Sequence, residues 1–351
     1  MGSDVDTLAA PARPRAATRL VGIDVARALA FGGMLLAHFA ATRQPGDPGW
    51  LQAVDNAADG RSAPLFCLLL GVGAGLLAGR GTSDLAFVRR GLVLFAVGML
   101  VWPLVDRVYL ILPHYGLLLA AFPLARRMPT RWLLPGAALA FLLPSLVVAA
   151  VGEQGLRSAG QPSTYGELLD AGAILGQILW TGGYPVVGWA GFVLVGAWLV
   201  RQRLDDAPTQ RRLLVGGVAV AVTQPLVAAA YSVTGWPFLD SAAHSNQTAW
   251  YVLASATAVA TVAGFLILAR VGPAVVRPLV PLGQTALTAY LAHLALGQAL
   301  VFPWRAAADP PLAVQVALVV VVFTAFAVAA AAWLARHRRG PLETVVRALA
   351  R

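Results

Sequence analysis

Ten long apolar runs, separated by short polar segments, constrain the fold of this chain more than any other feature. Each run has about 17 to 24 residues, the length that an α-helix needs to cross a hydrocarbon core of roughly 30 Å. Of the 351 residues, 58% are hydrophobic and 12% are charged, whereas roughly 25% are charged in a typical soluble domain. The sequence therefore predicts an all-α, polytopic helical bundle embedded in the lipid bilayer, with about ten transmembrane helices at 19–40, 62–79, 87–105, 108–125, 132–151, 184–200, 213–233, 249–269, 283–302 and 312–335.

The arginines predict the orientation of this bundle. All 26 basic residues are arginine. If the N-terminus is inside, they concentrate in the cytoplasmic segments, as in other membrane proteins. Arg19, Arg89 and Arg90 lie at the inner ends of their runs and count with these segments, and Arg27 alone lies deeper within a run. We therefore expect both termini to be cytoplasmic. The same rule explains the net charge of +10, so no nucleic-acid partner is expected.

One apolar segment, 166–180 (GELLDAGAILGQILW), is too short for a regular span. An eleventh crossing there would move two basic segments to the outside, so we predict an interfacial or re-entrant helix on the outer side. No internal repeat or domain boundary is visible. We expect one transmembrane domain at 19–336, between a disordered cytoplasmic tail at 1–18 and a basic cytoplasmic tail at 337–351.

The first apolar run contains Asp24, Arg27 and His38, which share one narrow face of a helix. A charge that faces lipid costs roughly 2.5 to 3.5 kcal/mol, so this face is expected to line a polar pocket. Asp24 and Arg27 are three residues apart and could equally form a local ion pair. His38 has no charged residue three or four positions away, and an imidazole is suited to moving protons near neutral pH, which makes it the catalytic candidate.

Further polar residues are expected in the outer layer of the bundle. A histidine within a membrane often serves only as a hydrogen bond between helices, but convergence from five separate segments favours a site. The candidates for substrate binding are Asp59, Arg61, His114, Tyr184, His244, Ser245 and His293.

The second apolar run carries small residues at every fourth position: Cys67, Gly71, Gly75 and Gly79. This stripe predicts close approach of another helix. Cys67 is the only cysteine, so no intrachain disulfide can form. HExxH and CxxC motifs are absent from the sequence, and no metal is expected.

The opening run resembles the signature of integral-membrane acyltransferases, in which a basic residue precedes I-D-x-x-R and a later histidine. Several further segments resemble bacterial relatives of heparan-alpha-glucosaminide N-acetyltransferase. The signature residues are Arg19, Ile23, Asp24, Arg27 and His38, and the further segments are DGRSAPLFCLLLGVGAGL (59–76), LILPHYGLLL (110–119), TGGYPVVGWAGFVLVG (181–196), AHSNQTAW (243–250) and GQTALTAYLAHL (283–294).

This resemblance implies transfer of an acetyl or short acyl group from cytoplasmic acyl-CoA to a sugar hydroxyl or amine of an envelope glycan or glycolipid, in the bacterial cytoplasmic membrane. His38 would take the catalytic position, with Asp24 and Arg27 as the rest of the motif. Arg89 and Arg90, near the inner surface, are candidates for holding the phosphates of acyl-CoA. Segment 42–61 contains no histidine, whereas the animal enzyme places a catalytic histidine in the corresponding loop.

Two other functions fit the same residues. The polar-faced helices could carry a small solute or protons, with His38 and His293 as titrating relays. The chain could also be a non-catalytic membrane scaffold. The acceptor, the length of the acyl group and the formation of a homo-oligomer are left open by the sequence.

Overall fold

The computed structural model describes residues 20–40, 43–155 and 161–350. The predicted tail at 1–18 lies outside these ranges. No strand occurs in the described part of the chain, and the all-α bundle predicted from the sequence is confirmed. Its helices are α1 (Val21–Phe39), α2 (Gly49–Ala58), α3 (Ser62–Gly79), α4 (Asp84–Val101), α5 (Leu112–Arg127), α6 (Thr130–Gly155), α7 (Ala171–Gly176), α8 (Val186–Leu199), α9 (Ala207–Ala221), α10 (Gln224–Thr234), α11 (Thr248–Val271), α12 (Pro273–Val276), α13 (Val280–Gln284), α14 (Ala286–Leu296), α15 (Phe302–Ala308), α16 (Leu312–Leu334) and α17 (Pro341–Leu349).

Eight helical segments of the described residues are long and apolar enough to cross a membrane. A ninth is formed if α7, the π-helical turn Gln177–Thr181 and α8 count as one span bent by 47°. This bent unit includes most of the segment predicted to be interfacial or re-entrant. Helix α5 has 16 residues and falls below the length of a span, so the count of ten stays a prediction.

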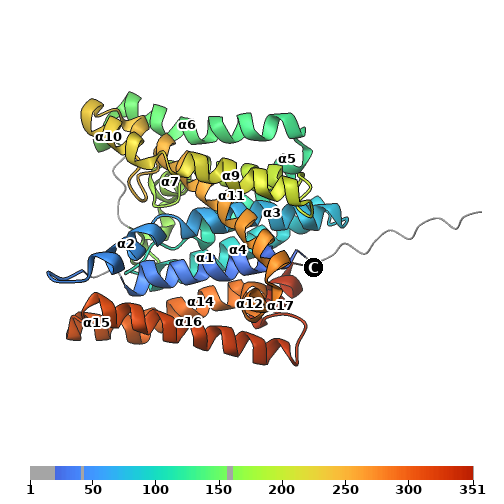
Figure 1. The fold of residues 1–351 in the computed structure, drawn as a ribbon. Coiled ribbons are helices and arrows are strands. Elements are labelled where there is room, and N and C mark those ends of the chain that lie inside the picture. Colours follow the sequence, from blue (N-terminus) through green and yellow to red (C-terminus); the bar gives the residue numbers. More distant parts are fainter. Residues whose placement is uncertain (1–19, 41–42, 156–160, 351) are drawn as a thin grey trace, which may run out of the picture.

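Helix α1 lies in the middle of the bundle, with α3 on one side and α14 and α16 on the other (Figure 1). Two glycines bring its neighbours close. A Cβ on Gly22 would lie 2.6 Å from the Phe265 carbonyl oxygen of α11, and one on Gly283 would lie 1.8 Å from the Asp24 carbonyl oxygen. Small residues thus let α1 touch the backbones of α11 and α13 directly.

The stripe on α3 packs against α8. A Cβ on Gly71 would lie 2.2 Å from the Val193 carbonyl oxygen, and one on Gly196 would lie 2.1 Å from the Leu68 carbonyl oxygen. Gly79, at the end of the stripe, has open space around it. Close approach of another helix therefore occurs along the middle of the stripe and stops before its end.

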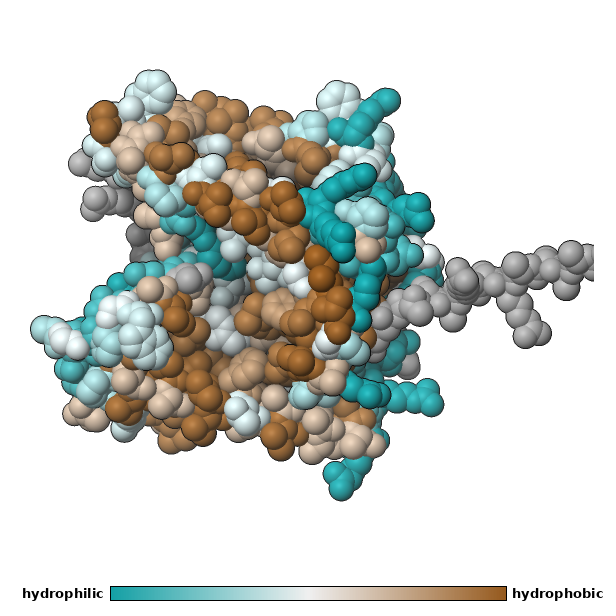
Figure 2. Space-filling model, in the orientation of Figure 1, coloured by the Kyte–Doolittle hydropathy of each residue, from teal (hydrophilic) through white to brown (hydrophobic). Residues whose placement is uncertain are grey.

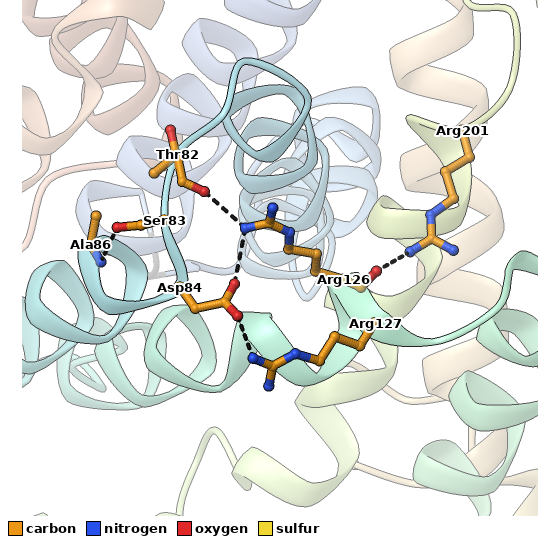
Figure 3. A network of polar contacts seen from close by, with 7 residues as sticks. All are labelled: Thr82, Ser83, Asp84, Ala86, Arg126, Arg127 and Arg201. Atoms are coloured by element: carbon orange, nitrogen blue, oxygen red, sulfur yellow. Dashed lines mark hydrogen bonds and ion pairs between the residues drawn. The ribbon is translucent and has the colours of Figure 1, made fainter.

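Arginines tie several turns together at one end of the bundle. Asp84 accepts from Arg126 at 2.9 Å and from Arg127 at 2.5 Å, and Arg126 also donates to the Thr82 carbonyl (Figure 3). Arg201 donates to the carbonyls of Ala125, Arg126 and Met128, which are among the last carbonyls of α5 and of the turn after it. These contacts hold the ends of α5 and α8 beside the start of α4.

Two further contacts extend this group. Arg270 at the end of α11 donates to the Asp205 carbonyl. Glu343 of α17 accepts from the backbone N–H groups of Leu287 and Thr288 in the first turn of α14, and from the Thr288 hydroxyl. We call this end of the bundle the basic end. It unites segments that the arginine distribution predicts to share one side of the membrane; their placement on the cytoplasmic side stays a prediction.

Candidate active site

A cavity of about 190 Å³ lies at the opposite end of the bundle, which we call the cavity end. Six parts of the chain surround it: α1, the turn between α2 and α3, the segment 107–111, the segment before α8, the loop 240–247, and α14. Its lining includes the predicted residues His38, Asp59, Tyr184 and His244, together with Ser62, Arg107, Tyr109 and Tyr290.

His38, in the last turn of α1, pairs with a second histidine. Its Nδ1 lies 2.9 Å from Nε2 of His293 in α14, and the two rings are nearly parallel. His293 is completely buried, with Phe31, Phe39 and Tyr290 around its ring. The pair fixes the orientation of His38, whose Nε2 is not used in this bond.

Asp59 and His244 form a second pair in the cavity wall. His244 Nε2 lies 3.5 Å from Asp59 Oδ1. The hydrogen bond from His244 lowers the pKa of the Asp59 carboxyl, and partial burial opposes this shift. Asp59 is therefore an anion at neutral pH and can accept a hydrogen bond from a hydroxyl or amine in the cavity.

The backbone brings Asp59 and His244 together by unusual conformations. Gly60 has φ of 66°, and a Cβ there would lie 2.8 Å from the Ala243 Cβ, so the turn after α2 requires glycine. His244 and Asn246 also have positive φ, at 60° and 54°. Such residues are uncommon and persist where the surroundings hold them.

Asn246 and Ser245 anchor this loop. The Asn246 side-chain oxygen accepts from Trp189 Nε1 at 3.0 Å and from the Tyr251 hydroxyl at 3.2 Å, and its amide donates to the Gly183 carbonyl. Ser245, predicted to bind substrate, instead donates to the Asp240 carbonyl and accepts from the Gln247 N–H. It does not line the cavity and acts in shaping the loop.

A smaller cavity of about 80 Å³ lies next to the first, on the side nearer the basic end. The two share Met34, Ile111 and Tyr290, and the smaller one is almost wholly apolar. It reaches Ala286 and Leu287, in the same first turn of α14 that Glu343 caps. The two cavities are thus neighbours, and the smaller one lies between His38 and the first turn of α14.

Asp24 and Arg27 lie lower on α1, outside both cavities. Arg27 donates to Asp24 Oδ1 at 3.0 Å, and a Cβ on Gly73 of α3 would lie 2.7 Å from an Arg27 guanidinium nitrogen. The local ion pair considered from the sequence is therefore formed, and Arg27 reaches across the face of α3. Neither side chain touches His38.

The remaining predicted residues lie outside the cavity. His114 is buried between Trp102 and Tyr184, so it supports the wall that Tyr184 forms. Arg61 is directed away from the cavity toward α10, and burial lowers the pKa of its guanidinium. Arg89 and Arg90 are on α4 at the basic end, where Arg90 is within electrostatic range of Arg339 and Arg347.

Tyr290 and Arg107 are cavity residues that the sequence reasoning did not single out. The Tyr290 hydroxyl is buried and makes no hydrogen bond of normal geometry within the described residues. Its spacing of three residues from His293 places both on one face of α14 and could have indicated it. Arg107 lies in a non-helical segment, where no periodicity points to it. No group of three or more histidine, cysteine, aspartate or glutamate residues suited to a metal occurs in the described part of the chain.

Two families match the sequence. The one described as heparan-alpha-glucosaminide N-acetyltransferase, catalytic, matches residues 19–230. The one described as protein of unknown function (DUF418) matches residues 196–351. No curated protein matches the chain. The cavity draws on both matched regions, with His38 and Asp59 in the first and His244 and Tyr290 in the second.

Proposed function

Because the chain belongs to the heparan-alpha-glucosaminide N-acetyltransferase-like family and is a multi-pass membrane protein, we propose that it transfers an acetyl or short acyl group from acyl-CoA to a sugar hydroxyl or amine of the cell envelope. The observation that carries this proposal is His38, held by His293 at 2.9 Å and facing a cavity that also contains Asp59 and His244. A positioned imidazole beside a carboxylate is an arrangement that suits activation of a hydroxyl or amine.

In this mechanism His38 is the general base. The mechanism assigns the proton of the His38–His293 contact to Nδ1 of His38, so that Nδ1 donates to His293 Nε2 and the Nε2 lone pair of His38 can take the acceptor proton. The acceptor oxygen or nitrogen attacks the thioester carbonyl, the new C–O or C–N bond forms, and the C–S bond breaks. The proton on His38 then passes to the departing thiolate, giving the acylated sugar and free CoA. Asp59 and Tyr184 orient the acceptor.

Acyl-CoA enters from the basic end. The smaller cavity is apolar and suits the pantetheine arm and the acyl group. At the end of this cavity nearer the basic end, Glu343 contacts the first turn of α14. Arg339 lies four residues before Glu343 in the sequence, and Arg347 lies four residues after it. These two arginines and Arg90 are suited to binding the phosphates of CoA. The two cavities together extend from His38 to Ala286 and Leu287 in the first turn of α14, which is the part of the route that the pantetheine arm would occupy.

Purified protein in proteoliposomes, supplied with acetyl-labelled acetyl-CoA and envelope glycans, tests this function. We expect label to pass to the glycan, His38→Ala to abolish the transfer, and His337→Gln to leave it intact, because His337 stacks on Trp333 at the basic end. Transfer by His38→Ala at the parental rate would refute the assignment. Passage of an unmodified solute without transfer would favour a transporter. The absence of both transfer and solute passage would favour a scaffold.

His293 has a positioning role in this scheme. We expect His293→Gln to lower kcat much more than it changes KM, and to alter the pH dependence of kcat, because Gln can accept the bond but not share a proton as imidazole does. An unchanged pH profile with reduced protein stability would mean that His293 only supports the fold.

A further inference from the structure

Arg61 is a cation that the cavity does not use. Asp59, Gly60 and Ser62 line the cavity, but the Arg61 side chain passes outside it and donates to Gln224 Oε1 of α10 at 3.1 Å. Its second terminal nitrogen, NH1, is buried and has no hydrogen-bond partner among the described residues. A guanidinium with a buried, unsatisfied donor is suited to binding an anionic oxygen.

Gln224 lies on a surface that faces lipid. Helices α9 and α10 together, Ala207–Thr234, are long and apolar enough to form one membrane span, and only 6% of its most apolar 18-residue stretch is buried within the bundle. The neighbours Val222 and Leu226 are 65% and 73% exposed, and Gln224 is exposed between them. Polar groups on a lipid-facing helix are costly unless they meet water or polar headgroups.

The depth of Gln224 fits the headgroup layer. It is 17 residues beyond Ala207, so a rise of 1.5 Å per residue places it about 26 Å from the basic end of α9, near the far boundary of a hydrocarbon core of roughly 30 Å. The space-filling view shows a hollow in this face of the molecule, between the part formed by α9 and α10 and the part formed by α1 and α2, with hydrophilic residues inside it (Figure 2).

We propose that the acceptor is an amphiphile, a glycan attached to a membrane lipid through a phosphate or diphosphate. The anionic group binds Arg61, the hydrocarbon chain lies along α10, and the sugar reaches the cavity from the side, past the turn that carries Asp59. This inference rests on the proposed acyl transfer and names the class of its acceptor.

Binding of the anionic lipid can be measured without knowing the sugar. The probe is a long-chain polyprenyl diphosphate added to the protein in nanodiscs, with the uncharged polyprenol and inorganic diphosphate as controls. We expect the diphosphate lipid to bind, the two controls not to bind, and Arg61→Gln to weaken the binding at least ten-fold. Arg43→Gln is the matched control, because Arg43 is an exposed arginine at the same end that donates to Asn56.

Gln224→Glu provides a second variant in case Arg61→Gln does not fold. A carboxylate at this position pairs with Arg61 and repels an anionic lipid, so binding is expected to fall by a similar factor. Equal binding by the parent, Arg61→Gln and Gln224→Glu, or equal binding of uncharged polyprenol, would overturn the proposal.

The acceptor itself is tested with labelled acetyl-CoA and two envelope fractions from cells that carry the protein, total membrane lipids and water-soluble glycans. We expect label in the lipid fraction, released into water by mild acid, which cleaves sugar diphosphates. Label only in soluble glycans would overturn this inference and leave acyl transfer standing. Label in neither fraction would refute acyl transfer and this inference with it.

Discussion

Contact between the backbones of α3 and α8 makes a quantitative prediction for Gly71→Ala. The added Cβ would lie 2.2 Å from the Val193 carbonyl oxygen, about 1 Å closer than ordinary contact allows, so the two helices must move apart by a similar distance. A gap of this size removes up to half of the roughly 0.1–0.2 kcal/mol that each atom pair contributes, and on the order of 30 such pairs would lose about 1–3 kcal/mol.

Thermal unfolding of purified protein, followed by the fluorescence of its 10 tryptophans, measures this loss. We expect a clear fall in the unfolding midpoint for Gly71→Ala. The matched control is Gly79→Ala, four positions from the next member of the same stripe, where nothing lies within 4 Å of the new Cβ. That variant is expected to equal the parent or exceed it slightly, because alanine has the higher helix propensity.

Gly196→Ala, on the other side of the same contact, sharpens the test. Its Cβ would lie 2.1 Å from the Leu68 carbonyl oxygen, so the single variant is expected to lose a similar free energy. Once the helices have separated for one methyl group the second costs less, and the double variant should lose less than the two singles together. A Gly71→Ala protein that unfolds at the parental temperature would refute the close packing, and strict additivity would refute the shared separation.

Three further predictions follow from the site and its supports. Because the pKa of Asp59 is lowered in the folded protein, its ionised form stabilises the fold above the ordinary carboxyl pKa, and this contribution is lost as the pH falls. The difference in unfolding midpoint between the parent and Asp59→Asn should therefore shrink from pH 6 to pH 3. A difference that stays constant over this range would contradict the prediction. Asn246→Ala leaves the Nε1–H of buried Trp189 without its acceptor and should lower the free energy of unfolding by about 1–3 kcal/mol. The same change should disturb the alignment of Asp59 with His244 and so reduce acyl transfer. An unaltered unfolding midpoint would show that Asn246 does not anchor the loop. Glu343→Ala removes the acceptor for two N–H groups of α14 and should lower the free energy of unfolding by about 0.5–2 kcal/mol. Glu343→Asp keeps the negative charge on a shorter side chain, and so tests whether the length of the side chain matters. Equal stability of the parent and Glu343→Ala would show that water replaces the carboxylate as acceptor.

Hydropathy and arginine counts predict much of this fold because a bilayer imposes simple demands. Apolar length alone indicates the helices, and the excess of arginine groups the turns that Asp84, Arg126 and Arg201 join at the basic end. Helix periodicity also places Asp24 beside Arg27. The same reasoning brings His38, Asp59 and His244 to one end, since each lies near the outer limit of a predicted run.

Side-chain direction is what the sequence does not provide. Contact between His38 and His293 depends on the rotation of α14 relative to α1, and hydropathy says little about rotation when a helix is apolar all round. Asp59 and Arg61 are two residues apart, yet one faces the cavity and the other faces α10 because Gly60 turns the chain between them. The contact of α17 with α14 depends on one side chain, Glu343. The composition of its segment, 337–351, predicts only a basic tail and gives no sign of this contact.

The left-handed backbone at His244 also bears on how this site can evolve. Glycine adopts φ near 60° freely, asparagine, aspartate and histidine do so more often than other residues, and branched residues such as valine and isoleucine do so very poorly. Few residue types can therefore replace His244 while the loop keeps its conformation. Among descendants of this chain, a change of acceptor would be expected to exchange His244 for asparagine or aspartate, so that backbone geometry, as well as chemistry, determines which specificities are within reach.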